Sequence, residues 1–500
     1  MSISDMHSIN LGFIIDKKAE IHPERIAIID TSMGTSYTYG DLKERSDSCA
    51  HYLREMGLKR GDTVSIISIT RIESFDLMLA CAKLGCVFVP VNFRLSAKEI
   101  DRILSDAESR IVFYDSIFKD RYQQIDHHVR KVIDINTISL DTPTSEKPHY
   151  THGKAEEPFV LIYTSGSSGE PKGVIQTHLN AFFKSVDSII DWGMTCDDVV
   201  LVTAPLFHVA GLNALTISGL HLGGRLVLQK RFEAEETLQI IEDHNVTCFA
   251  VVPTALRMMV NAPSFPEREL RSLRFMPVGG EPLEVALQEA FLEKGAETLN
   301  VFGLSETTDG AIYQRPGDDL MNGSVGEIAT HVEVKLLSDA SQEVSEGEVG
   351  ELVVGGPTIS PGYWKSPRKT EETFQEGWMK TGDLAYRDKD GFFYMVGRGD
   401  DMIKSGAEKV SPAEIEQVIA SMPEVADVVV VGVPDKKWGQ VPKAIVARKR
   451  GMEIKEEDII KTCKRELAGY KKPKSVVIVD ELPKTGAGKV DRALIKKEFA

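Results

Sequence analysis

Two hydrophobic patterns alternate along the first 390 residues of the chain. Apolar positions at helical spacing occur in LEVALQEAFLEKG (residues 283–295), whereas the short runs VEVKLL (332–337) and ELVVGG (351–356) predict strands. The continuous apolar run Phe159 to Tyr163 predicts a buried strand. We therefore predict an α/β to α+β fold, with a large N-terminal domain of sheets covered by helices.

The pattern changes near residue 398. Residues 397–401, GRGDD, are polar and rich in glycine, as a hinge would be, although the same residues could form only a solvated turn. Ser411, Pro412 and Glu414 then supply an N-cap, a proline at the first helical position and an acid at N3, so a helix is expected to start there.

The rest of the chain predicts a small, mobile C-terminal α+β domain. Strands are expected at 428–431, 443–448 and 476–479, and a helix is expected at 456–468. We therefore predict a domain over residues 1–397, a hinge over 398–401 centred on Asp400, and a second domain over 402–500.

Composition limits the class of protein. The 500 residues are 42% hydrophobic, enough for a large core. The six cysteines lack C-x-x-C pairs and zinc-like spacing, which predicts reduced thiols in a cytoplasmic protein. We expect no secretory signal, because the N-terminus lacks a basic region followed by a long apolar run. We expect no transmembrane segment, because polar residues interrupt even the most apolar stretch, Leu206 to Leu228.

Charge is unevenly distributed. The net charge of −16 argues against nucleic acid as a partner. Residues 401–500 carry 20 Lys and Arg against 16 Asp and Glu, so this part is basic on an acidic body. The imbalance is consistent with a lid over an anionic ligand and also with ordinary solvated surface.

The first candidate site is TSGSSGEPKG, residues 164–173, directly after the predicted buried strand. Closely spaced backbone N–H groups, hydroxyls and glycines suit a phosphate cradle. The stretch is not a Walker A loop, because Gly173 stands where that motif needs Ser or Thr. A flexible Gly/Ser connection is the alternative.

Three further motifs follow in order: NVFGLSETTDG (300–310), GWMKTGDLAYRDKDGFFYMVGRGDD (377–401) and ELPKTGAGKVDR (481–492). Together with the first loop, they resemble the adenylate-forming superfamily of acyl-CoA synthetases, luciferases and peptide-synthetase adenylation domains. The resemblance covers nearly the whole chain. It implies that a carboxylate attacks the α-phosphate of ATP to give an acyl-adenylate, and that a thiol then displaces AMP.

The resemblance also implies roles for the charged residues. Two unit charges 4 Å apart repel by about 4 kcal/mol at an effective dielectric of 20, so joining two anions needs placed positive charge. Lys172, Lys489 and Mg²⁺ would supply it, with Glu306 and Thr164 binding the metal. Lys484 is the competing candidate for the lysine of the last motif.

The nucleotide site implied by the resemblance spans several segments. The phosphates would lie on Thr164, Ser165, Gly166, Ser167, Ser168, Gly169 and Lys172. Phe302 would stack on adenine, where relatives usually carry Tyr, and Asp383 would bind the ribose with Arg398 nearby. Gly280, Glu281, Pro282, Gly303 and Ser305 complete the predicted contacts.

The acid and thiol sites are implied in the same way. His208 would border the acyl carboxylate, although a lone histidine among apolar residues is also a common core residue. Ala210, Gly211, Gly279 and Gly303 would line an apolar acyl pocket. Ser405, Gly406 and Ala407 would line the tunnel for coenzyme A, at a position where relatives often have Ser-Gly-Gly.

The choice of reaction within the superfamily rests on residues that the chain lacks. No acid lies near His208 to hold a substrate ammonium, and eleven residues after Lys489 leave no room for a carrier domain. We therefore expect an acyl-CoA ligase that uses ATP, Mg²⁺ and coenzyme A. A fatty acid is the first candidate for the carboxylic acid, followed by an aryl acid and a small dicarboxylic acid. A catalytically silent nucleotide-binding scaffold and a homodimer stay open.

Overall fold

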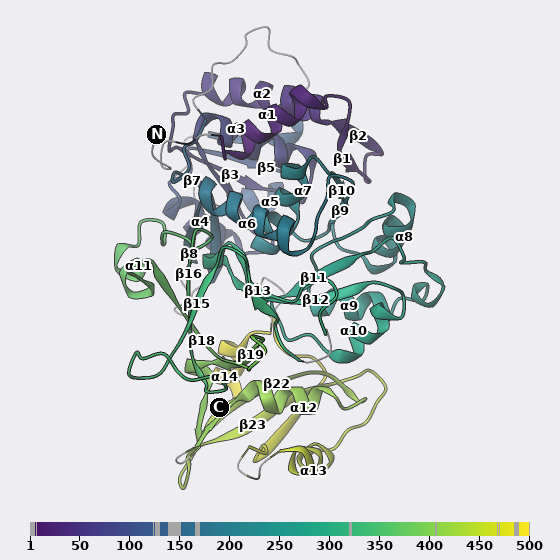
Figure 1. Ribbon diagram of the computed structural model, residues 1–500, viewed down its shortest axis with the longest axis vertical. Helices are drawn as coiled ribbons and strands as arrows, with labels where there is room; N and C mark the ends of the chain where they lie inside the picture. The colour runs from purple at the N-terminus through teal and green to yellow at the C-terminus, as the bar shows by residue number, and fades with distance from the viewer. Residues whose placement is uncertain are drawn as a thin grey trace. The chain divides into compact units, whose positions relative to one another are not determined.

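The computed structural model describes residues 6, 8–123, 125, 131–138, 152–165, 171–319, 323–405, 408–467, 469, 471–484 and 490–499. Two compact units are present, Met1–Val334 with Val354–Met379 and Lys335–Val353 with Lys380–Ala500 (Figure 1).

A six-stranded sheet in the first unit carries the phosphate-loop candidate. Its strand order is β6-β5-β3-β4-β7-β8, parallel throughout except for the antiparallel pair β7 and β8. The strands are β3 (Thr63–Ile67), β4 (Val87–Pro90), β5 (Ile111–Tyr114), β6 (Lys131–Asp134), β7 (Pro158–Ser165) and β8 (Pro171–Thr177). The buried strand predicted at 159–163 is therefore confirmed as β7.

Helices cover both faces of this sheet because successive strand residues point to opposite sides. Val64 and Ile66 pack into one core cluster with α3 (Ile72–Leu84), whereas Ile67 packs into another with α4 (Ala97–Asp106). Capping places α4: Ser96 and Glu99 form a reciprocal capping box at its start. The predicted α/β class is confirmed by this arrangement.

Two further sheets lie in the first unit. One has the order β2-β1-β10-β9 and the other β11-β12-β13-β14. Their strands are β1 (Ile26–Asp30), β2 (Thr35–Thr38), β9 (Val199–Val202), β10 (Arg225–Leu228), β11 (Phe275–Gly279), β12 (Glu297–Leu304), β13 (Asp309–Tyr313) and β14 (Glu327–Ile328). The remaining α-helices are α1 (Leu11–Ile21), α2 (Tyr39–Glu55), α5 (Lys119–Tyr122), α6 (His178–Asp191), α7 (Thr216–Leu222), α8 (Ala234–His244), α9 (Pro253–Val260), α10 (Val285–Leu292) and α11 (Pro367–Thr373).

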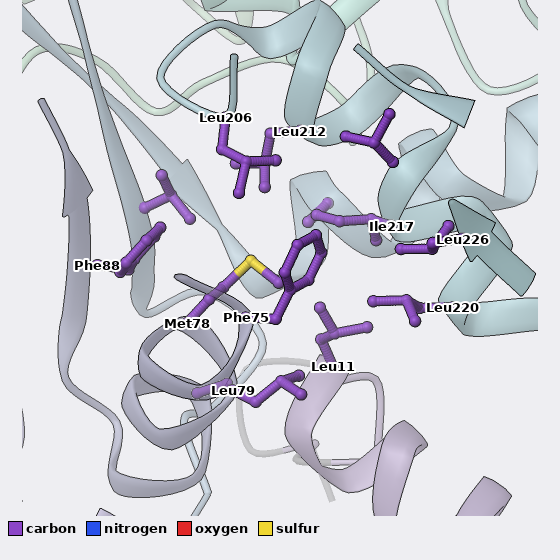
Figure 2. Packing of buried hydrophobic residues seen from close by; sticks show 14 of the residues in the cluster. Leu11, Phe75, Met78, Leu79, Phe88, Leu206, Leu212, Ile217, Leu220 and Leu226 are labelled. Carbon is purple, nitrogen blue, oxygen red and sulfur yellow. The ribbon is translucent and has the colours of Figure 1, made fainter. Parts of the chain in front are cut away.

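The largest core cluster joins segments that are far apart in sequence. Figure 2 shows side chains from α1, α3, β4, α7 and β10 gathered around Phe75. Leu206 and Leu212 point into the same core and are 5% and 0% exposed. Because these two residues flank His208, packing fixes the backbone on both sides of that histidine.

The second unit contains a five-stranded C-terminal sheet of order β21-β20-β23-β22, with β24 beside β23. The helices α12 and α13 pack on one face through Ile415 and Ile459, and α14 packs on the other through Ile495. The elements are β20 (Ile403–Ser405), β21 (Glu408–Val410), α12 (Pro412–Ala420), β22 (Val425–Asp435), β23 (Gly439–Arg448), α13 (Glu456–Glu466), β24 (Ser475–Val479) and α14 (Arg492–Phe499). The strands and helices predicted for this region are confirmed, including the helix start at Ser411-Pro412.

Another sheet has the order β15-β16-β18-β17, with β19 beside β18. Its strands are β15 (Glu333–Leu337), β16 (Gly350–Gly355), β17 (Phe374–Gln375), β18 (Trp378–Arg387) and β19 (Phe393–Arg398). The predicted hinge, 398–401, begins at the last residue of β19 inside the second compact unit and includes the short 3₁₀ turn η7 (Gly399–Asp401). The domain boundary at 397 and the hinge stay predictions. Within the described ranges, no helix is both long and apolar enough to cross a membrane.

Candidate active site

The first loop motif joins two antiparallel strands. Thr164 near the end of β7 lies opposite Lys172 near the start of β8, and Ser165 lies opposite Pro171. The predicted contacts Gly166, Ser167, Ser168 and Gly169, and the side chain of Ser165, lie outside the described residues. The hairpin therefore holds the half-buried Thr164 and Lys172 side by side at one edge of the sheet.

Glu306 reaches this edge from a distant part of the chain. It lies in η6 (Ser305–Thr307), between β12 and β13. The Tyr363 hydroxyl donates a hydrogen bond to Glu306 Oε1 at 2.8 Å, and Lys172 Nζ lies 5.0 Å from the centroid of the same tyrosine ring. Lys172 and Glu306, 134 positions apart in the sequence, thus meet on one side chain.

Hydrogen bonds hold the turn that carries Glu306 in place, although the residues after it adopt an unfavourable backbone conformation. The Ser360 N–H donates to the Glu306 carbonyl at 2.8 Å, and the Leu304 N–H donates to Thr307 Oγ1 at 2.8 Å. Thr308 and Asp309 follow with φ of +58° and +108°, a region that side chains rarely adopt. Strained backbone of this kind is typical of functional turns.

The adenine and acyl candidates lie at the carboxyl ends of two neighbouring strands. β11 and β12 are neighbouring strands (Figure 1) that run parallel, with Gly279 opposite Val301. Gly280 and Phe302 therefore follow at the same edge of the sheet. Parallel strands commonly bind ligands at this edge. Gly303 has to be glycine, because a Cβ there would lie 2.1 Å from the Asp309 carbonyl oxygen.

Glu281 and Pro282 follow this edge, and Glu281 is held by α9. Its Oε2 accepts a hydrogen bond from Thr254 Oγ1 at 3.3 Å and lies 3.6 Å from Arg257 Nη2. Arg257 also pairs with Glu284. The carboxylate of Glu281 therefore already has a hydrogen-bond donor and a cation of α9 beside it.

His208 precedes a short π-helix, η4 (Ala210–Ala214). The N–H groups of Gly211 and Leu212 both donate to the His208 carbonyl, at 3.0 and 3.1 Å. A Cβ at Gly211 would lie 2.2 Å from the Pro205 carbonyl oxygen, so the backbone approach requires glycine. Single-turn π-helices frequently mark functional sites.

A buried polar contact links this π-helix to the Glu306 turn. Asn213 donates to Gln176 Oε1 at 2.8 Å, and Gln176 Nε2 donates to the Ser305 carbonyl at 3.4 Å. Both amide side chains are almost fully buried. The first unit thus brings together the β7–β8 hairpin, which is the candidate phosphate site, with the Glu306 turn and the His208 segment.

Asp383 and Arg398 meet in the second unit, as cross-strand partners on β18 and β19. Arg398 Nε lies 3.2 Å from Asp383 Oδ1. Burial raises the pKa of Asp383 above its ordinary value, although the Arg398 guanidinium acts in the opposite direction.

The remaining predicted residues of the second unit are only partly described. Ser405 is buried at the end of β20, and the Asp400 backbone lies in η7. Gly406, Ala407 and Lys489 lie outside the described residues. Lys484, the competing lysine, pairs with Val490 in an antiparallel bridge.

Sequence reasoning missed Tyr363, Gln176 and Asn213. The only sequence signal for Tyr363 is an aromatic residue after Gly362 in a turn-rich stretch, which gives no partner. Gln176 lies in a strand between apolar neighbours, where a polar side chain is a signal of a buried hydrogen bond.

Known proteins match this chain over nearly its full length. The family described as AMP-binding enzyme matches residues 15–364, and the AMP-binding enzyme C-terminal domain matches residues 414–489. A feruloyl-CoA synthase from Amycolatopsis is 33% identical over 99% of this chain and 100% of its own. A long-chain-fatty-acid–CoA ligase of Mycobacterium tuberculosis is 32% identical over 98% of this chain and 99% of its own. The structure of O-succinylbenzoate coenzyme A synthetase from Bacillus subtilis with ATP and magnesium ion superposes with a TM-score of 0.87, at 33% identity, over 97% of this chain and 99% of that one.

Proposed function

The chain belongs to the family of AMP-binding enzymes and is an AMP-forming acyl-CoA ligase, and we propose that it activates a fatty acid. ATP, Mg²⁺ and coenzyme A are its co-substrates and cofactor. The single observation that best supports the assignment of the site is the meeting of Lys172 and Glu306 at Tyr363.

The first half-reaction joins two anions. A carboxylate oxygen of the acid attacks the α-phosphorus of ATP, the bond from that phosphorus to the bridging oxygen breaks, and pyrophosphate leaves. We assign Thr164 and the following loop residues to the phosphates, with the Lys172 ammonium offsetting negative charge that develops on the leaving group. Lys489 would act on the attacking carboxylate and the α-phosphate.

The residues around Glu306 fit a magnesium ion. Mg²⁺ prefers oxygen ligands and is usually held by one or two carboxylates together with substrate phosphates and water. Tyr363 occupies Oε1 of Glu306, and no described residue hydrogen-bonds to Oε2. Groups of three or more His, Cys, Asp or Glu suited to a metal are absent from the described ranges. The ion would neutralise phosphate charge during transfer.

The second half-reaction needs a different set of contacts. The thiol sulfur of coenzyme A attacks the acyl carbon, the bond from that carbon to the phosphate oxygen breaks, and AMP leaves. We assign the tunnel for the thiol to Ser405, Gly406 and Ala407, and the swing between the two steps to Asp400. Asp383 and Arg398, which pair with each other, are proposed to bind the ribose.

The proposed acid has an apolar tail. Small residues, Ala210, Gly211 and Gly303, occur where the resemblance predicts the acyl pocket. One relative at 32% identity is named a long-chain-fatty-acid–CoA ligase, which supports a fatty acid. An aryl acid is the second candidate because a relative at 33% identity is named a feruloyl-CoA synthase.

A panel of acids tests this proposal. The full-length protein is mixed with ATP, Mg²⁺ and fatty, aryl or small dicarboxylic acids, and pyrophosphate release is measured first without and then with coenzyme A. We expect the highest kcat/KM with a fatty acid and the matching thioester in the second assay. Preference for an aryl acid overturns the substrate assignment, and no pyrophosphate with any acid favours the catalytically silent scaffold.

Two proposals concern the protein's surroundings. The six cysteines are unpaired, five of them buried, which supports a reducing, cytoplasmic location. A homodimer stays a prediction that the molar mass in solution will test.

A further inference from the structure

Tyr363 is held rigidly beside the phosphate hairpin. The Trp364 N–H donates to the Gly173 carbonyl at 2.7 Å, and the Ile175 N–H donates to the Gly362 carbonyl at 3.1 Å, so this segment pairs with β8. The ring packs edge-on against Phe374, and the side chain is buried. A buried ring between two backbone anchors has little freedom to move.

This rigid side chain contacts two residues of the proposed site in two chemically different ways. Its hydroxyl donates to Glu306 Oε1 at 2.8 Å, a hydrogen bond strengthened by the acceptor's negative charge. Its ring face lies 5.0 Å from Lys172 Nζ, within the range of a cation–π interaction. One tyrosine therefore restrains both a carboxylate and an ammonium.

We propose that Tyr363 is a positioning residue that orients Glu306 for Mg²⁺ and holds Lys172 ready for the phosphates of ATP. The proposal rests on the proposed function, because it assumes that Glu306 binds the metal. A fixed Oε1 leaves the carboxylate with one preferred orientation, so Oε2 meets the cation without first losing rotational freedom. The ring likewise limits the conformations of the long Lys172 side chain before ATP arrives.

Two substitutions of Tyr363 separate the effect of its hydroxyl on Glu306 from the effect of its ring on Lys172. Tyr363→Phe removes the hydroxyl and keeps the ring, so it should affect the metal and leave Lys172 restrained. Tyr363→Leu removes both contacts. A tyrosine that served only to fill the core would show no such separation, because losing one buried oxygen would not distinguish metal-bound from metal-free ATP.

Equilibrium binding provides the test. Isothermal titration calorimetry measures the Kd of ATP with Mg²⁺ and with EDTA, in the absence of acid, and the ratio of the two gives the advantage that the metal provides. For Tyr363→Phe we expect this advantage to fall about tenfold while metal-free ATP binds within about twofold of wild type. For Tyr363→Leu, metal-free ATP should also bind about threefold more weakly.

The matched control is Tyr394→Phe. Its hydroxyl also donates to a carboxylate, Asp388 Oδ2 at 3.1 Å, and we place neither residue in the site. The control should leave both Kd values unchanged, and thermal denaturation should show that each variant is folded.

A second variant keeps the test decisive. In Glu306→Gln the metal advantage should already be low, and adding Tyr363→Phe should lower it no further. An unchanged advantage in Tyr363→Phe, or independent effects in the double variant, overturns the positioning role. Wild-type protein that neither binds ATP nor releases pyrophosphate with any acid instead overturns the proposed function.

Discussion

Lys184 is a fully buried lysine in α6 of the first unit. Its ammonium donates a hydrogen bond to the Gly310 carbonyl at 3.0 Å and lies over the rings of Tyr313 and Trp192, at 4.6 and 5.2 Å from their centroids. Gly310 is the strand partner of Gly303, so this lysine supports the hairpin that carries Glu306. We predict that Lys184→Met destabilises the first unit.

The expected loss of stability follows from the buried carboxylate that Lys184→Met leaves without a nearby cation. Burial raises the pKa of Asp309, and the Lys184 ammonium is the largest effect that opposes this shift. Removing one partner of buried charges commonly costs about 3–5 kcal/mol, part of which is offset here because burying the ammonium itself lowers the pKa of Lys184 and costs free energy. We therefore expect a loss of about 3 kcal/mol at pH 7.

Guanidinium unfolding followed by tryptophan fluorescence measures the change. Adding Asp309→Asn should recover about half of the loss, because it removes the unpaired carboxylate. The control is Lys17→Met, an exposed lysine paired with Glu20, which should change stability by less than about 0.5 kcal/mol. A Lys184→Met protein as stable as wild type, or no recovery from Asp309→Asn, would refute the reasoning.

Four further predictions concern other parts of the protein. Lys172→Ala should lower kcat for adenylation about 10²–10³-fold in folded protein, and an unchanged rate of pyrophosphate release contradicts its role. Lys489→Ala should block acyl-adenylate formation yet still convert synthetic acyl-adenylate to thioester, whereas Lys484→Ala should carry out both half-reactions. Equal slowing of both half-reactions by Lys489→Ala counts against the assignment. Burial lowers the pKa of His178 to about 3, so the folded state binds a proton less well than the unfolded state. This histidine should therefore lower stability by about 1.4 kcal/mol per pH unit as pH drops below about 6.5, and His178→Gln should make the slope of the denaturation midpoints against pH shallower by that amount; an unchanged slope contradicts it. Gly211→Ala should raise KM for the acid about tenfold or more with ATP binding retained, because its Cβ would meet a backbone carbonyl at 2.2 Å; an unchanged KM argues against the pocket.

Local signals in the sequence predicted much of the fold. The Ser411-Pro412 start of α12 follows from an N-cap and a proline at N1, interactions made within one turn of helix. The strand at 159–163 follows from a continuous apolar run, because a strand between two helical layers has no polar face. Residues close together in the sequence specify these elements, so they can be predicted from a single sequence.

The partners of the site residues could not be predicted in the same way. Tyr363 meets Lys172 only because its segment pairs with β8, and no periodicity in either segment specifies that pairing. Asp309 interacts electrostatically with Lys184 for a similar reason: the positive φ of Thr308 and of Asp309 itself influences where its carboxylate lies. Such contacts depend on the register between distant strands, which hydrophobic patterns constrain only loosely.

The residues around His208 differ in how far they are buried, and therefore in how strongly packing constrains them. Leu206 and Leu212 are in the core, where shortening a leucine to alanine costs about 2–5 kcal/mol, so their size is constrained by packing. His208 and Ala210 lie between them and are only half-buried, so their side chains can change at lower cost to the fold. Val209 is also half-buried, but it packs against the core. Relatives named for feruloyl and long-chain fatty acyl substrates share about a third of their residues with this chain over nearly its whole length. On the proposed assignment of His208 and Ala210 to the acyl site, we expect substitutions at these two positions to change the preferred acid more than the stability of the protein.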